Sequence, residues 1–161
     1  MLRSFIGAAA VLASVAFSPA ASAQQSSGQI RASNPDSVVA ALQRAGYRAD
    51  FSRDSGGDPM ITSASSGKTF IIFFYGCDSG NACKSIQFYA GFPGARNASF
   101  EALNTWNAKR RFGRAYRADN GAARVEMDIQ LTNGGISDAL FTDNLDLWTS
   151  LMAKFDTYVN N

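Results

Sequence analysis

The strongest hydrophobic pattern in the chain lies in residues 70–92, FIIFFYGCDSGNACKSIQFYAGF. Its first six residues are all apolar or aromatic, and glycines stand close to both ends of this run. A short apolar run bounded in this way is typical of a strand that is buried on both faces. From residue 85 onward apolar and polar side chains alternate, which is typical of a strand with one face on the core. The pattern therefore predicts a central β-hairpin.

Four further strands are predicted around this hairpin, at residues 47–53, 59–63, 112–118 and 123–131. The last of them has the clearest alternation of apolar and polar side chains. Its apolar positions are Val125, Met127, Ile129 and Leu131. Turns rich in Gly, Asn and Asp separate the strands, and such short connections predict antiparallel pairing.

Three helices are predicted from capping residues and apolar spacing. The first begins at Asn34-Pro35-Asp36 and ends near Gly46, and the second runs from Ser99 to about Lys109. Ser137 caps a long third helix whose apolar residues recur at intervals of 4 and 3. These residues are Phe141, Leu145, Trp148, Met152, Phe155 and Val159. The order α-β-β-β-β-α-β-β-α predicts an α+β fold with a largely antiparallel sheet that the last helix covers.

The first 23 residues have the features of a secretory signal peptide. Arg3 precedes an apolar run, Pro19 ends that run, and an Ala-x-Ala motif predicts cleavage between Ala23 and Gln24. An uncleaved membrane anchor is the alternative, but an apolar run of about 13 residues is shorter than the roughly 20 that a spanning helix needs. We therefore expect a protein of the periplasm or of the secreted fraction.

The remainder of the chain is predicted to have two parts. Residues 24–33 are polar and contain Gly and Ser, which indicates a flexible N-terminal tail. Residues 34–161 are long enough to form one domain with its own core. Since no second apolar segment follows, we expect no stable membrane insertion after cleavage.

Charge and the absence of histidine restrict the possible functions. The chain has 15 Lys and Arg residues against 13 Asp and Glu residues, and this near-neutral balance argues against a nucleic-acid-binding protein. With no histidine, Ser-His-Asp and Cys-His catalysis and His-ligated metal sites are excluded. We expect no catalytic residues, no metal, no cofactor and no enzyme activity.

The two cysteines, Cys77 and Cys83, enclose the loop of the central hairpin. Their spacing differs from the Cys-x-x-Cys spacing of redox-active pairs. In an exported protein two cysteines usually pair with each other. We expect a structural disulfide, with a reactive thiol as the alternative.

Two groups of acidic residues could carry chemistry, and each has a structural alternative. Asp54, Asp58 and Asp78 lie in Gly-rich loops and could bind calcium, although turns also favour Asp and Gly. Glu126 and Asp128 share one face of a strand and could act as an acid–base pair. On a half-exposed strand such carboxylates are more often only solvated.

A basic cluster follows the second predicted helix. Its members are Lys109, Arg110, Arg111, Arg114 and Arg117. The cluster could contact an anionic partner or phospholipid head groups. The alternative is that these cations stabilise the helix C-terminus and form ion pairs with the next strand.

The strand at residues 70–75 has apolar side chains on both faces, and this suggests an interaction surface. If all helices pack on one side, the other face is left for a protein partner or for a second copy of the chain. Coverage by the protein's own helices is the alternative. The possible interaction residues are Phe70, Ile72, Phe74, Arg111 and Arg114. The side chains on the other face of the strand are Ile71, Phe73 and Tyr75.

Several short motifs are the most specific features of the chain. They are Gly57-Asp58-Pro59, Tyr75-Gly76-Cys77, Trp106-Asn107, Arg111-Phe112 and Gly134-Gly135-Ile136. In this order, over about residues 36–159, they resemble the YbjN family of bacterial proteins, which are labelled as sensory transduction regulators. The resemblance implies a fold similar to that of type III secretion chaperones, which bind other proteins and often dimerise. It supplies no catalytic residues, and the signal peptide and cysteine pair depart from the cytoplasmic members.

These observations favour a non-enzymatic, exported protein that binds another protein in a chaperone-like or regulatory role. One alternative is a small hydrolase that uses carboxylates such as Glu126 and Asp128. Another is a structural or stress protein of the cell envelope that binds no small ligand.

Overall fold

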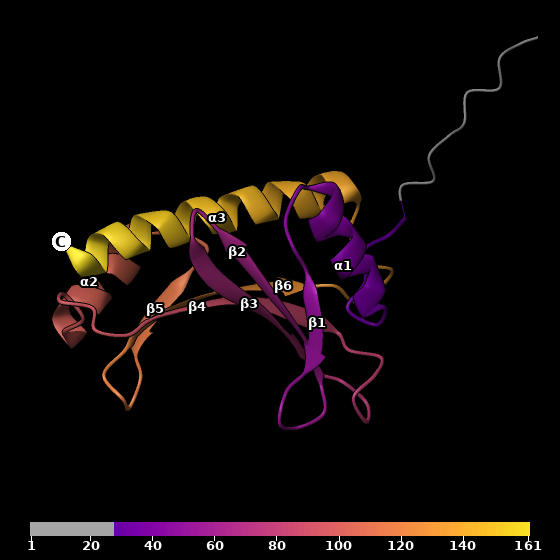
Figure 1. Cartoon of the computed structure of the whole chain (residues 1–161), viewed down its shortest axis with the longest axis horizontal. Coiled ribbons are helices and arrows are strands. Elements are labelled where there is room, and N and C mark those ends of the chain that lie inside the picture. The colour runs from indigo at the N-terminus through magenta and orange to yellow at the C-terminus, as the bar shows by residue number, and fades with distance from the viewer. Residues whose placement is uncertain (1–27) are drawn as a thin grey trace, which may run out of the picture.

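The computed structural model describes residues 28–161 as three helices and one six-stranded sheet (Figure 1). The helices are α1 (Pro35–Arg44), α2 (Phe100–Lys109) and α3 (Asp138–Asn160). The strands are β1 (Asp50–Arg53), β2 (Pro59–Ser65), β3 (Lys68–Tyr75), β4 (Ser85–Phe92), β5 (Arg114–Arg117) and β6 (Ala123–Gln130). The predicted element order is confirmed. The predicted signal peptide, with its cleavage site between Ala23 and Gln24, lies outside the described residues.

The sheet has the strand order β1-β2-β3-β4-β6-β5, and every neighbouring pair is antiparallel. The predicted hairpin forms its centre, with Ile72 opposite Phe88. The first strand starts later than predicted, at Asp50, because the N–H of Tyr47 still donates to the carbonyl of Leu42 and closes the end of α1. The antiparallel α+β fold is therefore confirmed, with small shifts at element ends.

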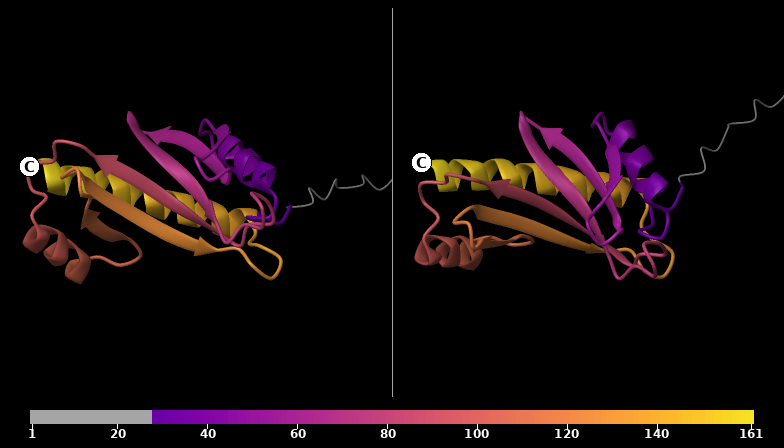
Figure 2. Two further views of the ribbon diagram at one scale, coloured as in Figure 1. Left: turned by 90° about the horizontal axis from the view of Figure 1, so that it is seen from below. Right: turned by 60° about the horizontal axis from the view of Figure 1, so that its bottom comes forward.

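Helix α3 lies along one face of the sheet, with α1 beside its start and α2 beside its end (Figure 1). All six residues of its predicted apolar stripe are buried. Seen from below, the central strands have no helix in front of them, so only one face of the sheet centre is covered (Figure 2). None of the three helices in residues 28–161 combines the length and the apolar character that crossing a bilayer requires.

Aromatic side chains fill the space between α3 and the sheet. Trp148 stacks on Phe88 with ring centroids 5.6 Å apart, and Phe70 meets the same tryptophan edge-on at 6.1 Å. Phe141 adds a further contact to Phe88 at 6.4 Å. Such pairs contribute roughly 0.5–1.5 kcal/mol each beyond the area that they bury. The centre of the core is thus where β3, β4 and α3 meet.

The predicted flexible tail is wrong for its described part, because this segment pairs with the residues just before α3. The N–H of Ile30 donates to the carbonyl of Ile136 at 2.8 Å, and the reverse bond measures 3.0 Å. Ile30 and Ala32 are both buried. A Cβ on Gly135 would lie 2.2 Å from the Ile30 carbonyl oxygen, so the Gly134-Gly135-Ile136 motif allows this close approach.

Helix α2 closes the β5 edge of the sheet. The side-chain amide of Asn107 donates to the carbonyl of Ala115 at 2.9 Å and accepts from the N–H of Ala115 at 2.8 Å. Its neighbour Trp106 is buried against Phe155, with ring centroids 5.0 Å apart. The Trp106-Asn107 pair therefore fixes α2 to α3 and satisfies backbone groups that an edge strand would otherwise expose.

Candidate functional site

The side chains of β3 show which face of the sheet is available to a partner. Phe70, Ile72 and Phe74 are 0%, 0% and 1% exposed because they lie on the face that α3 covers. Their selection as interaction residues was wrong, since β3 is apolar on both sides and its own sequence does not reveal which side the helix takes. Ile71, Phe73 and Tyr75 lie on the other side, where they are half-buried or exposed.

We call the uncovered side of strands β3, β4, β6 and β5 the open face. It is made by side chains that project from four neighbouring strands in register. They are Ile71, Phe73 and Tyr75 of β3, Gln87 and Tyr89 of β4, Arg114 and Tyr116 of β5, and Arg124, Glu126 and Asp128 of β6.

Glu126 organises the charged half of the open face. Its side chain is only 5% exposed, although it lies on the uncovered side of the sheet. Arg114 donates to one carboxylate oxygen through Nε at 2.9 Å and through Nη2 at 2.7 Å. The hydroxyl of Tyr116 donates to the other oxygen. The carboxylate thus holds two side chains of the neighbouring strand in fixed positions.

The hydrogen bonds of Glu126 also change the acid–base properties of its partners. The side-chain hydrogen bond to Glu126 and the charge of that carboxylate raise the pKa of Arg114. Burial, followed by the hydrogen bond to Glu126, raises the pKa of Tyr116 above its ordinary value near 10.0. Arg114 therefore stays a cation and Tyr116 stays a neutral donor throughout the physiological pH range.

A second group of side-chain hydrogen bonds connects three strands on the other half of the open face. The hydroxyl of Tyr75 donates to Oε1 of Gln87 at 3.3 Å, and Nε2 of Gln87 donates to Asp128 at 2.8 Å. Burial, and then the charges of Glu126 and Asp128, raise the pKa of Tyr75. Because β3, β4 and β6 are joined in this way, their side chains form one connected layer.

Aromatic rings of the open face contact one another and the guanidinium of Arg124. Phe73 meets Tyr89 edge-on with ring centroids 5.5 Å apart, and Tyr75 lies 6.5 Å from the same phenyl ring. The guanidinium of Arg124 stands 5.7 Å from the ring of Tyr89 and 5.9 Å from that of Tyr116. Tyrosine, phenylalanine and arginine are enriched where proteins bind other proteins.

The acid–base pair considered for Glu126 and Asp128 does not match this geometry. The two residues do share a face, as the strand pattern predicts. However, both oxygens of Glu126 already accept hydrogen bonds from Arg114 and Tyr116, and Asp128 accepts one from Gln87. A general acid or base must be able to reach a substrate proton, so this arrangement favours a positioning role for Glu126.

The disulfide and the acidic loops have structural roles. Cys77 and Cys83 form the expected disulfide at the end of the hairpin. The carboxylate of Asp54 accepts the N–H groups of Gly56 and Asp58 at 2.8 and 3.0 Å, which is a turn-stabilising arrangement. Within residues 28–161 no three Cys, Asp or Glu side chains come together in a way that could hold a metal ion.

The basic cluster is divided between two environments. Arg114 forms the expected ion pair with the next strand, through Glu126. No ion pair within residues 28–161 involves Lys109, Arg110, Arg111 or Arg117. Three of these cations instead stand near aromatic rings, at distances between 4.6 and 5.9 Å. Only part of the cluster is therefore explained by ion pairing.

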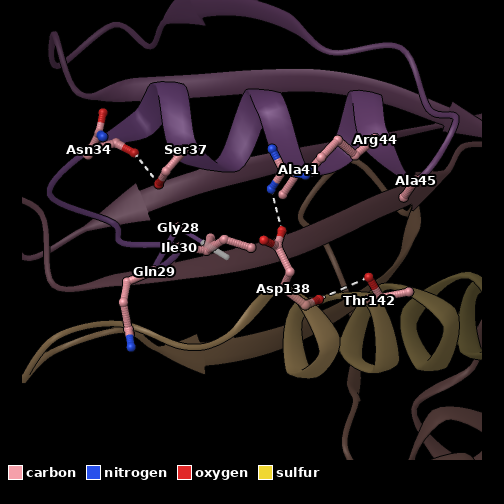
Figure 3. Close-up of a pocket in the computed structure, with 10 residues that line it drawn as sticks. All are labelled: Gly28, Gln29, Ile30, Asn34, Ser37, Ala41, Arg44, Ala45, Asp138 and Thr142. Carbon is pink, nitrogen blue, oxygen red and sulfur yellow. Dashed lines mark hydrogen bonds and ion pairs between the residues drawn. The ribbon is translucent and has the colours of Figure 1, made fainter. Parts of the chain in front are cut away.

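A hollow of about 890 Å³ lies between α1, the segment before it and the start of α3 (Figure 3). Arg44 of α1 points across it and forms an ion pair with Asp138 of α3. Thr142 donates to the backbone carbonyl of Asp138 at 3.0 Å. The charged groups of the hollow thus neutralise each other and fix α1 to α3, so we do not assign a ligand to it.

Several residues of the open face were not recognised from the sequence as functional. Gln87, Tyr89, Tyr116 and Arg124 occupy the polar positions of alternating strands, and such positions are ordinarily solvated. The signal that could have found them is the presence of aromatic residues, Tyr89 and Tyr116, at positions that the alternation assigns to the uncovered side.

Comparison with known proteins supports a family assignment. No curated protein matches the chain. The model of the YbjN family, described as "putative bacterial sensory transduction regulator", matches residues 34–161. This range contains every helix and strand of the structure, including the open face. The chain therefore belongs to the YbjN family.

Proposed function

We propose that this YbjN protein is an exported binding protein without enzymatic activity, and that its open face receives another protein in a regulatory or chaperone-like role. The observation that carries the proposal is a sheet face that no helix of the described residues covers, on which aromatic and charged side chains are already fixed by one another. The description of the family as a regulator agrees with a binding role.

The fixed side chains favour binding because less freedom is lost when a partner arrives. Arg114 is 66% exposed, yet its guanidinium is fixed by the almost fully buried Glu126. Phe73 and Tyr89 support each other in the same layer. Immobilising a long side chain at an interface costs roughly 0.5–1.5 kcal/mol, and here the protein's own fold has already met part of that cost.

The mixed polarity of the face favours a different protein over a second copy of the chain. The cations Arg114 and Arg124 are balanced by Glu126 and Asp128, and the aromatic rings between them are only partly exposed. Permanent homodimer interfaces are more apolar than this, whereas transient interfaces combine aromatic residues, arginine and a polar rim. We therefore expect a monomer that binds a protein partner reversibly.

Export is a separate part of the proposal. The disulfide is consistent with an oxidising compartment, and the Ala-x-Ala motif supports cleavage between Ala23 and Gln24. The intact mass of protein recovered from the periplasm should correspond to residues 24–161 with one disulfide. A mass that includes Met1, in the exported fraction, would contradict processing.

Site-specific photo-crosslinking tests the binding surface. A benzoyl-phenylalanine placed at Phe73 resembles the native side chain and should crosslink a different protein in the envelope of living cells. The same group at Phe51 is the matched control. This phenylalanine is exposed, but it lies at the β1 edge in register with Ile61 and Ile72, on the side of the sheet away from the open face. The captured protein should then bind purified wild-type protein, and Phe73→Ser or Arg114→Gln should weaken that binding at least tenfold, by about 1.4 kcal/mol.

Three outcomes would contradict the proposal. The first is a stable dimer in light scattering that Phe73→Ser dissociates, because the open face would then be occupied by a second copy. The second is unchanged binding of the partner by both open-face variants. The third is hydrolase activity of the mature protein that Glu126→Gln abolishes, which would favour the enzymatic alternative.

A further inference from the structure

The most exposed aromatic residues of the described chain flank α2, away from the open face. Phe100 begins this helix and is 75% exposed, and Phe112 follows it and is 59% exposed. The guanidinium of Arg117 lies 5.9 Å from the ring of Phe100, and that of Arg111 lies 4.6 Å from the ring of Phe112. Two phenyl rings exposed to water beside arginines require an explanation that core packing does not supply.

Positive charge is concentrated in the same stretch. From Arg96 to Arg117 the sequence has six Lys or Arg residues and a single acid, Glu101, which gives a local net charge of +5. The rest of the chain has nine Lys or Arg residues and twelve acids, a net charge of −3. Because Lys109, Arg110, Arg111 and Arg117 form no ion pair within residues 28–161, their charge is available to an anionic partner.

The backbone of Phe112 is unusual for a bulky residue. Its φ angle is +70°, in the left-handed region that favours glycine and asparagine. Phe112 is also absent from the side chains that pack against the core of the described domain. The bend between α2 and β5 would form more easily with glycine, so the fold gives no reason for a phenyl ring at this position.

From these observations we propose that α2 and the bend after it form a peripheral membrane-binding surface for anionic phospholipid head groups. We call Phe100, Lys109, Arg110, Arg111, Phe112 and Arg117 the α2 patch. Its cations would contact the phosphates while Phe100 and Phe112 enter the boundary between head groups and acyl chains, as in other interfacial segments. This surface is distinct from the open face and does not depend on the function proposed for it.

The position of the patch favours a bilayer over an acidic protein. Helix α2 lies at one end of the molecule, where it can approach an extended surface (Figure 1). An acidic peptide could bind this region by adding a strand to β5, but Asn107 already occupies both backbone groups of Ala115 on that edge. The balanced charge of the open face suits a protein, whereas the net charge of the α2 patch suits an anionic membrane.

Vesicle binding by the mature protein, residues 24–161, tests the proposal. Vesicles of equal parts phosphatidylglycerol and phosphatidylethanolamine should bind the protein in sedimentation, and added salt should release it. Vesicles of phosphatidylcholine should not bind it. A Phe100→Trp variant should show a blue shift of tryptophan fluorescence with the anionic vesicles only, since the native Trp106 and Trp148 are already buried.

Substitutions in the α2 patch should separate the contribution of its positive charge to vesicle binding from that of its phenyl rings. Arg110→Gln combined with Arg111→Gln should weaken vesicle binding by about fivefold for each cation removed. Phe112→Gly should weaken it as well, while thermal unfolding stays unchanged or shifts upward because the backbone strain is relieved. The matched control is Arg48→Gln with Lys84→Gln, which removes two exposed cations outside the patch and should leave binding within twofold.

Equal binding to phosphatidylcholine would overturn the proposal, because charge would then have no role. So would an equal loss of binding in the control variant, or full binding by both patch variants. Binding to polyglutamate without binding to anionic vesicles would also overturn it, and would assign the patch to an acidic protein.

Discussion

The two faces of β3 differ in what covers them, although both are apolar in sequence. Phe70, Ile72 and Phe74 are almost completely buried beneath α3. On the other side Ile71 and Phe73 are half-buried, and Tyr75 is 46% exposed. The apolar content of one strand therefore does not decide whether a face becomes core or surface.

The neighbouring strands account for this difference. On the covered side β4 and β6 contribute Phe88 and Val125, which have no polar group to satisfy. On the open side the same strands contribute Gln87, Glu126 and Asp128, whose polar groups need partners or water. Burying the polar side under a helix would be costly, because charged groups lose hydration that an apolar helix face cannot replace. The side chains of the whole sheet therefore determine which face of β3 is buried.

Truncating one phenylalanine on each face of β3 should produce the largest difference in stability between the two faces. Phe70→Ala should lower the free energy of unfolding by about 3–5 kcal/mol, because Phe70 contacts Phe88 and Trp148 in the core. Phe73→Ala should cost about 1 kcal/mol, since its ring is already partly in water. Urea unfolding of both variants measures the difference, and equal losses would show that the open face is covered in solution.

Removing the disulfide should affect both faces together. Cys77→Ser with Cys83→Ser should lower the free energy of unfolding by about 2 kcal/mol, the value expected for a short closed loop. Because both faces share the β3–β4 hairpin, hydrogen exchange should become faster in the two strands alike. The reduced wild-type protein is the control and should show the same loss. Faster hydrogen exchange in only one of the two strands would contradict the idea that the disulfide stabilises both faces.

Neutralising Glu126 should affect the open face alone. Glu126→Gln should lower the free energy of unfolding by about 1–2 kcal/mol, because the three hydrogen bonds that its charged carboxylate accepts from Arg114 and Tyr116 are weakened. The Nε–H signal of Arg114 should lose its hydrogen-bonded shift in NMR spectra, while signals of the Trp148 ring stay in place. Asp128→Asn, on the same strand and face, is the control and should cost less. Movement of the core signals would mean that the two faces are coupled.

Alkaline pH should produce the smallest effect and should also be specific to the open face. Folding raises the pKa values of Tyr75 and Tyr116, so the folded protein holds these protons more tightly than the unfolded chain. Their contribution to stability is then complete below the unfolded value near pH 10 and is lost as pH rises through the higher folded values. Urea unfolding at a series of pH values should show this decline, and Tyr116→Phe should reduce its slope. An unchanged slope in that variant would assign the decline to other groups.

Much of the fold follows from local sequence. The capping serines Ser99 and Ser137 each accept a backbone N–H at the start of a helix, as predicted. The apolar stripe of α3 and the alternation in β6 are both reproduced in the burial pattern. The candidate site was harder to predict from the sequence, because Arg114 was expected to pair with the next strand but neither it nor Tyr116 was assigned to Glu126. A hydrogen bond between neighbouring strands depends on strand order and register, which no single segment contains.

The sequence by itself determined the order of helices and strands, the antiparallel sheet and the pairing of the two cysteines. These properties depend on residues close together in the chain, where capping, side-chain period and turn chemistry act directly. Only the tertiary structure decided which face of β3 is buried and that the segment around Ile30 pairs with Ile136. The physical reason is the same in both cases: burial and pairing depend on the side chains and backbone groups of distant segments, which make one arrangement lower in free energy, and the local sequence alone does not contain them.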